Sequence, residues 1–133
     1  MPQYQDDLSI ADDAELWRRI PADWVVWDGN LRQMRPTSQA FCNHPNGTPM
    51  SVALAHILAQ CGTGPDEVLA GHSGFALASL TTGLARECGQ MVARDPLPDE
   101  PAHALVVGEK THSVRKRFAS KCRWIVPPPR MTS

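Results

Sequence analysis

Proline and glycine divide this chain into short segments, and that division limits what it can fold into. The 133 residues include 12 prolines and 9 glycines. Proline interrupts helices and interior strands because its ring fixes φ and it has no N–H to donate, whereas glycine favours turns and helix ends. We therefore expect short helices and strands that are joined by well-defined turns.

The length and composition are those of one globular domain. A chain of 133 residues with 42% hydrophobic and 20% charged residues can build its own core without disulfide support. We expect a single domain over residues 1–133, with tails at residues 1–11 and 127–133. The net charge is −1, so no overall field attracts a nucleic acid or a membrane.

The charges are distributed unevenly along the chain. Acidic residues gather at the start, at Asp6, Asp7, Asp12, Asp13 and Glu15. Basic residues gather at the end, at Lys110, Arg115, Lys116, Arg117, Lys121, Arg123 and Arg130. We favour a solvated basic helix face there over a nucleic-acid footprint, although nucleic acid stays an alternative partner.

Neither the start of the chain nor its cysteines suggest secretion. The first residues are polar and lack the apolar region of a signal peptide, and no apolar run approaches the roughly 18 residues of a membrane span. The four cysteines are widely spaced and form no CxxC pair. We expect a cytoplasmic protein with free thiols that carries no metal, needs no cofactor and contacts no membrane.

Apolar periodicity and capping residues predict an α+β fold. Helical spacing predicts helices over residues 12–20, 49–61, 75–88 and 111–122. β-prone runs predict a hairpin over residues 24–35 and strands over 67–70, 90–94, 103–107 and 124–126. The result is one mixed β-sheet with an N-terminal hairpin, packed by about three amphipathic helices. A doubly wound α/β fold is the alternative.

Residues 103–107 form the most continuous apolar strand, so we expect them at or near the centre of the sheet. The leucine stripes of the helices predicted at 49–61 and 75–88 then cover that sheet.

Two sets of residues form a candidate catalytic site. Arg35 and Ser38, followed by Phe41, can hold a phosphate and stack a flat ring, although a simple hairpin end explains the same residues. His72 lies in a glycine turn and His103 begins a strand, and such positions can expose an imidazole for acid–base chemistry. An enzyme built on Arg35, Ser38, His72 and His103 requires these side chains to converge.

A third candidate site lies where the strand 103–107 meets the last predicted helix. Gly108 allows a close turn, and Thr111 can cap a helix whose first N–H groups lack intrahelical partners. Lys110 and Arg115 place positive charge beside those donors, so we expect an anion-binding site at this helix start. The alternative is a solvated helix face.

The tryptophans suggest a contact with a partner protein. Trp24 and Trp27 fall on opposite faces of the predicted hairpin strand, so one of them can be core while the other is partly exposed. An exposed tryptophan is a common anchor in protein–protein interfaces.

Four phrases resemble, in this order, a family of small bacterial proteins of unknown function: LWRRIP, RPTSQAF…MSV, AGHSGFALAS and PAHALVVGEKTHSV. The resemblance implies a bacterial cytosolic source and no particular activity. A weaker likeness is to ADP-ribosyltransferase-type domains, which place an arginine or a histidine on an early strand, then a serine–aromatic strand, then a glutamate. Arg19 or Arg35 and the segment Ser38 to Phe41 resemble the first two, whereas Glu109 follows a glycine and departs from the third.

These observations favour a binding or accessory protein over an enzyme, because no complete catalytic motif is present. Its ligand is expected to be a partner protein or a phosphate-bearing anion. The alternative is an enzyme that modifies a nucleotide or a nucleic acid, with features similar to an ADP-ribosyltransferase.

Overall fold

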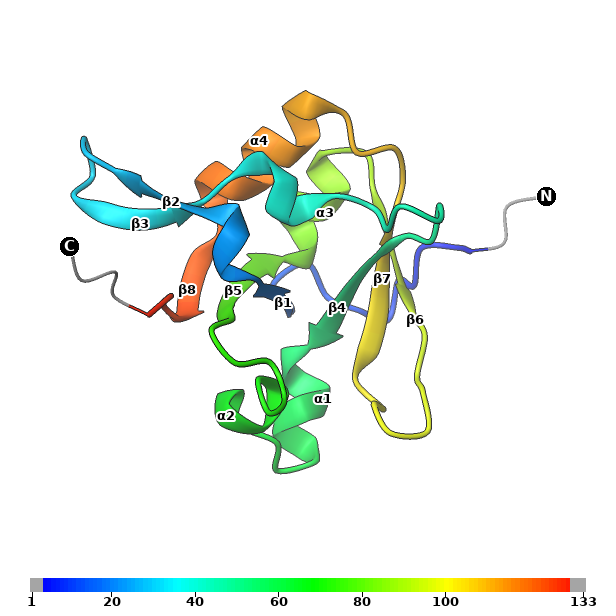
Figure 1. The fold of residues 1–133 in the computed structure, drawn as a ribbon. Coiled ribbons are helices and arrows are strands. Elements are labelled where there is room, and N and C mark those ends of the chain that lie inside the picture. Colours follow the sequence, from blue (N-terminus) through cyan, green and yellow to red (C-terminus); the bar gives the residue numbers. More distant parts are fainter. Residues whose placement is uncertain (1–3, 130–133) are drawn as a thin grey trace.

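The computed structural model describes residues 4–129 and shows an α+β fold, as predicted (Figure 1). The strands are β1 Glu15–Ile20, β2 Val25–Asp28, β3 Gln33–Pro36, β4 Met50–Leu54, β5 Ala76–Thr81, β6 Met91–Arg94, β7 His103–Val107 and β8 Arg123–Val126. The α-helices are α1 Ala55–Gln60, α2 Pro65–Val68, α3 Thr82–Glu87 and α4 His112–Lys121, and the 3-10 helices are η1 Ala22–Trp24 and η2 Ser38–Phe41.

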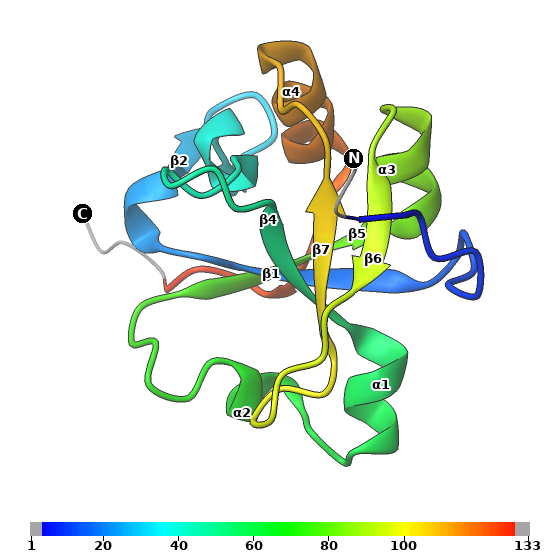
Figure 2. The ribbon, with the colours of Figure 1, turned by 90° about the vertical axis from the view of Figure 1, so that its right-hand side faces the viewer.

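Six strands form the main sheet in the order β6-β7-β4-β1-β5-β8, and β2 pairs with β3 in a separate two-stranded sheet. Every strand pairing among the described residues is antiparallel, whereas we expected one mixed sheet that included the hairpin. Strand β7 lies between β6 and β4 and is therefore interior, as expected. Figure 2 shows β4, β7 and β6 crossing the direction of β1, with α1 and α2 on one side of the strands and α3 and α4 on the other.

Three predicted helices were wrong in the same way. Residues 15–20, 50–54 and 76–81 are strands, and helix begins only after the last two of them, at α1 and α3. The patterns over 49–61 and 75–88 each cross a direct strand–helix junction, so side chains on two different elements imitated a single helical stripe, whereas residues 15–20 are strand up to Pro21. Thr81 marks the junction before α3, where its side-chain oxygen accepts a hydrogen bond from the Leu84 N–H at 3.1 Å.

Most of the remaining predicted helices and strands are present in the structure. The hairpin and the strands predicted at 90–94, 103–107 and 124–126 are present, and the helix predicted at 111–122 is α4. The strand predicted at 67–70 was wrong, because Pro65 begins α2 there and fits the first helical position. Among residues 4–129, no helix is long and apolar enough to cross a membrane.

The core lies between the main sheet and α4. Phe118 of α4 and Phe41 of η2 are fully buried and meet edge to face, with ring centroids 6.0 Å apart. Apolar residues of four strands pack around this pair, namely Leu16, Ile20, Met50, Leu54, Leu80 and Val106. This packing fixes η2 and α4 against one face of β1.

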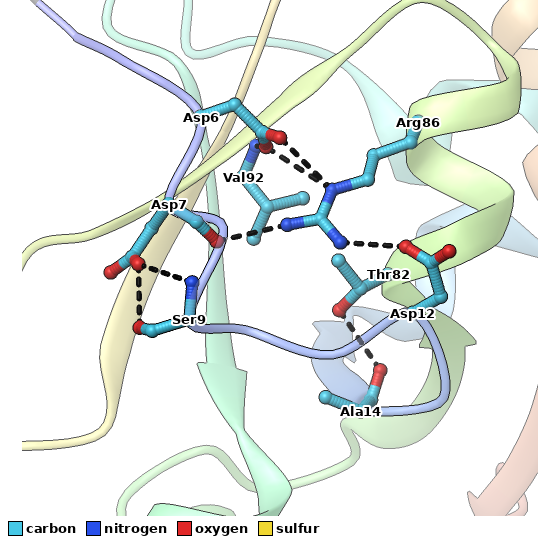
Figure 3. A network of polar contacts seen from close by, with 8 residues as sticks. All are labelled: Asp6, Asp7, Ser9, Asp12, Ala14, Thr82, Arg86 and Val92. Atoms are coloured by element: carbon cyan, nitrogen blue, oxygen red, sulfur yellow. Dashed lines mark hydrogen bonds and ion pairs between the residues drawn. The ribbon is translucent and has the colours of Figure 1, made fainter.

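The described part of the N-terminal segment is attached to the fold, which differs from the tail that we expected over residues 1–11. Arg86 of α3 donates to the carboxylates of Asp6 and Asp12 and to the Asp7 carbonyl (Figure 3). The Asp7 N–H donates to the Val92 carbonyl at 2.8 Å, and Ile10 is buried. Asp12 therefore binds Arg86 and caps no helix. Of the expected tail at 127–133, residues 127–129 belong to no helix or strand and the rest lie outside the described residues.

Candidate functional site

A cleft opens where β1 and β4 separate. Strand β1 pairs with β5 along all six of its residues, but with β4 only at Leu16–Leu54 and Trp17–Ala53. Beyond Trp17 the two strands part, and a cavity of about 310 Å³ lies there. Its other walls come from α1, from the segment around α2 and from the loop before β7. Polar and charged side chains are prominent in its lining, among them Trp17, Arg18, Arg19, Ser51, Thr63, Glu67, His72, Asp99, Glu100 and His103.

Arg18 occupies a core-facing position of β1. Side chains two residues apart on a strand share a face, and the neighbours on this face, Leu16 and Ile20, are fully buried. The Arg18 Nε atom donates to the Ala40 carbonyl at 3.1 Å, and Nη1 donates to the Ser51 carbonyl at 2.9 Å. Arg18 thus reaches across the opening between β1 and β4.

The charge of Arg18 lacks an acidic partner. Among residues 4–129, no carboxylate lies within ion-pair distance of its guanidinium. The pKa of Arg18 is lowered to about 10, mainly by burial and to a smaller degree by the nearby charge of Arg19. A desolvated cation without a counter-charge costs free energy, so an anion in the cleft would stabilise it.

Two further cations lie near Arg18. Arg19 donates through Nη1 to the Val68 carbonyl at 3.2 Å and places Nη2 3.7 Å from Glu100 Oε1, a long ion pair. Lys110 is close enough to Arg18 that its pKa is lowered to about 8 by burial and by the Arg18 charge. The cleft lining thus contains Arg18 and Arg19 together with Glu67, Asp99 and Glu100, and Lys110 lies near Arg18 outside the lining.

Trp17 adds an unused donor to the cleft. Its indole Nε1 atom is buried and has no hydrogen-bond partner among the described residues. Buried polar groups are nearly always paired, and an unpaired indole N–H costs about 1–3 kcal/mol. Trp17 and Arg18 leave β1 on opposite faces, but both line the cleft where β1 has parted from β4, so two donors border it and it suits a ligand that offers acceptor oxygens.

The two predicted histidines lie in this same cleft. The His103 Nδ1 atom lies 3.0 Å from the Asp95 carbonyl oxygen and 3.1 Å from Asp95 Oδ2. Both neighbours are acceptors, so Nδ1 carries a proton that they share. The His72 ring packs against Phe75 with centroids 5.1 Å apart.

The four residues of the predicted catalytic set do not converge. Arg35 and Ser38 line a different cavity, between the hairpin and α4, and Arg35 forms an ion pair with Asp28 at 2.9 Å. The alternative of an enzyme that has all four side chains in one pocket is therefore not supported by their positions. Phe41, which we expected to bind a ligand, lies in the core with no exposed surface and is unavailable for stacking.

The groups of the expected anion site at the start of α4 have other partners. Lys110 Nζ donates to Asn43 Oδ1, the Val106 carbonyl and the Gly108 carbonyl at 2.9, 2.8 and 3.0 Å. Thr111 caps α4 by accepting from the Val114 N–H at 3.2 Å, as predicted for a helix start. Arg115 Nε donates to the Lys110 carbonyl at 3.1 Å. These contacts stabilise the loop and give the Lys110 ammonium three acceptors within the protein.

Sequence reasoning missed Trp17 and Arg18, although one signal was present. In the order Leu16, Arg18, Ile20 the arginine interrupts an alternation that marks a strand, and a charge in such a row is itself unusual. The segment was interpreted as a helix, which hid the anomaly.

Of the three features that resemble ADP-ribosyltransferase-type domains, the structure contains the first, an arginine on an early strand. Arg19 does lie on an early strand, but Ser38–Phe41 is the 3-10 helix η2, and Glu109 lies outside the strands. No protein-family model, curated protein or solved structure matches the chain. Within the described residues, no three side chains of the metal-binding types come together as a metal site.

Proposed function

We propose that the protein binds a small phosphate-bearing molecule in the cleft between β1 and β4. The observation that carries the proposal is Arg18, a cation in the core-facing row of a strand with no carboxylate partner among the described residues. A phosphate would supply the missing negative charge and accept from the Trp17 N–H. The volume of about 310 Å³ suits a small ligand and not a folded partner.

Residues opposite the arginines support a ligand with a second polar part. Asp99, Glu100 and His72 line the same cleft and can accept hydrogen bonds from hydroxyl or amino groups. We keep the cytoplasm as the proposed location, because all four cysteines are free thiols, which fits a reducing compartment.

Calorimetric titration with a panel of phosphate compounds tests the proposal. The panel consists of inorganic phosphate, pyrophosphate, ribose 5-phosphate, AMP and ADP, each measured at low and moderate salt. Arg18→Gln should lower the affinity for the tightest-binding ligand about tenfold or more, because a charge-assisted hydrogen bond contributes about 1.5–3 kcal/mol. The control is Arg117→Gln, which removes a surface arginine that pairs with Glu87 at 3.2 Å outside the cleft.

Two outcomes would contradict the proposal. Either the wild-type protein binds no member of the panel, or Arg18→Gln binds as tightly as the wild type. Circular dichroism checks that Arg18→Gln is folded, and Arg18→Lys should retain part of the affinity because it keeps the charge but loses the forked geometry.

A second candidate function is catalysis in the same cleft, and the Asp95–His103 pair is the observation that favours it. A histidine whose Nδ1 proton is held by a carboxylate is oriented to accept a proton at Nε2. An enzyme that modifies a nucleotide would then hold the phosphate at Arg18 and transfer a proton at His103. His103→Gln should abolish turnover of a bound nucleotide and leave its binding intact, whereas unchanged turnover would exclude this role.

A further inference from the structure

A second concave surface lies between the β2–β3 hairpin and α4. This hairpin groove has a volume of about 750 Å³ and is separate from the cleft. The hairpin extends away from the main sheet in Figure 1, next to α4 and β8. The indole Nε1 of Trp124 in β8 donates to the Met34 carbonyl of β3 at 3.0 Å, which attaches the hairpin to the body.

The turn of the hairpin is well organised. Asp28 Oδ1 accepts from the N–H groups of Asn30 and Leu31 at 2.9 and 3.1 Å. The Leu31 N–H, more than the nearby Arg35, lowers the pKa of Asp28. Arg35 spans the hairpin to the same carboxylate. The projecting surface is therefore held in shape by its own contacts.

The hairpin exposes apolar side chains that the protein does not cover. Five large hydrophobic residues are exposed among residues 4–129, and three of them, Val26, Trp27 and Leu31, lie on this hairpin. Trp27 is 62% exposed and Leu31 is 60% exposed. Leu31 also lines the groove, together with Met34 and Trp124. A cluster of this kind on a two-stranded sheet is typical of an interaction surface.

The charge around the groove is positive. Its lining contains Arg35, Lys116 and Arg123 against the single acid Asp28, with Arg35 paired to Asp28 and Arg123 paired to Glu15 of β1. The ten residues of α4 include four cations and no carboxylate. Lys116 is exposed and forms no ion pair with any described residue. The groove thus combines an apolar lining with a basic rim.

We propose that the hairpin groove binds an acidic segment of a partner protein, one that carries apolar side chains among its carboxylates. The apolar residues would contact Leu31 and Met34, and the carboxylates would meet Lys116, which forms no ion pair with any described residue. A single-stranded nucleic acid fits less well, because such ligands stack on several aromatic rings in a row, whereas the lining has one indole, Trp124, which is half-buried and held by the Met34 carbonyl. The proposal is independent of the small-molecule cleft.

Selection from a random phage-displayed dodecapeptide library against the immobilised full chain tests this proposal. Enriched peptides should be acidic and contain apolar residues. In NMR titrations, the strongest of them should shift amide signals of residues 26–38 and 112–124. Lys116→Glu and Leu31→Ser should each lower the affinity for that peptide about tenfold or more, as expected for central interface contacts.

The chain offers a matched control for each variant. Lys121→Glu makes the same charge change on α4 outside the groove, and Leu8→Ser replaces another exposed leucine away from it. Both controls should bind the peptide as the wild type does. Enriched peptides without an acidic excess, equal losses in the controls, or tighter binding of an oligothymidine than of any peptide would overturn the proposal.

Discussion

The role of Lys110 gives the sharpest prediction about stability. Its ammonium donates to three oxygens, of which one belongs to Asn43 and two are backbone carbonyls. Lys110→Met keeps the length and most of the apolar stem of the side chain but removes all three donors. Lys110 connects the loop between η2 and β4 to the end of β7, so this variant should lose stability.

The expected loss is about 2 kcal/mol. Two of the three acceptors keep another donor, because Asn43 Oδ1 also accepts from the Met50 N–H and the Gly108 carbonyl also accepts from Asn43 Nδ2. Hydrogen bonds to a charged donor contribute about 1.5–3 kcal/mol each, but relief of the buried charge beside Arg18 offsets part of the sum.

The stability that Lys110 contributes should change with pH in a defined direction. The pKa of Lys110 falls from 10.5 to about 8 in the folded protein, so between these values the unfolded chain binds more protons. Stability that depends on this group therefore rises with pH across that window. The difference between wild type and Lys110→Met should be present at neutral pH and should increase towards pH 10.5.

Urea denaturation followed by circular dichroism measures both effects. Lys116→Met is the control, because this exposed lysine makes no hydrogen bond within the described residues, and its effect should stay within about 0.5 kcal/mol. The reasoning is refuted if Lys110→Met also stays within about 0.5 kcal/mol of the wild type, or if the difference shrinks as the pH rises.

Three other substitutions or modifications test the fold. Phe118→Ala should cost about 3–5 kcal/mol in urea denaturation, because it empties a fully buried site. Arg86→Ala should cost about 1–3 kcal/mol and should speed hydrogen exchange at the Asp7 amide, since Arg86 fixes the N-terminal segment. Burial raises the pKa of Cys122 to about 11, so iodoacetamide should label the exposed Cys61 well before Cys122, as mass spectrometry can show.

Local signals in the sequence were sufficient where an element had its own caps and turns. Thr111 begins α4, the Asp28–Gly29 turn marks the hairpin, and residues 103–107 form a buried strand. The same signals failed at β4 and β5, because a strand runs into a helix there without a turn. Apolar spacing alone cannot separate a short strand from a buried helix turn, and sheet pairing with distant segments decided the outcome.

The cleft was only partly predictable. His72 and His103 were chosen for their positions at element ends, and both line it. Arg18 and Trp17 become notable only when β1 is known to leave β4 after two residue pairs, which depends on contacts across 30 or more positions of the chain. Arg35 and Ser38 were grouped with the histidines by residue type, but the fold places them beside α4.

The indole N–H signals of the four tryptophans test the central claim most directly. In a ¹⁵N-labelled sample titrated with pyrophosphate and then with ADP, the Trp17 signal should move saturably, together with the Arg18 Nε signal, and yield one dissociation constant. The signals of Trp27 and Trp124 should stay in place, because these residues lie outside the cleft. A Trp17 signal that does not move while either ligand binds, or a shift at Trp27 instead, would contradict a phosphate site between β1 and β4.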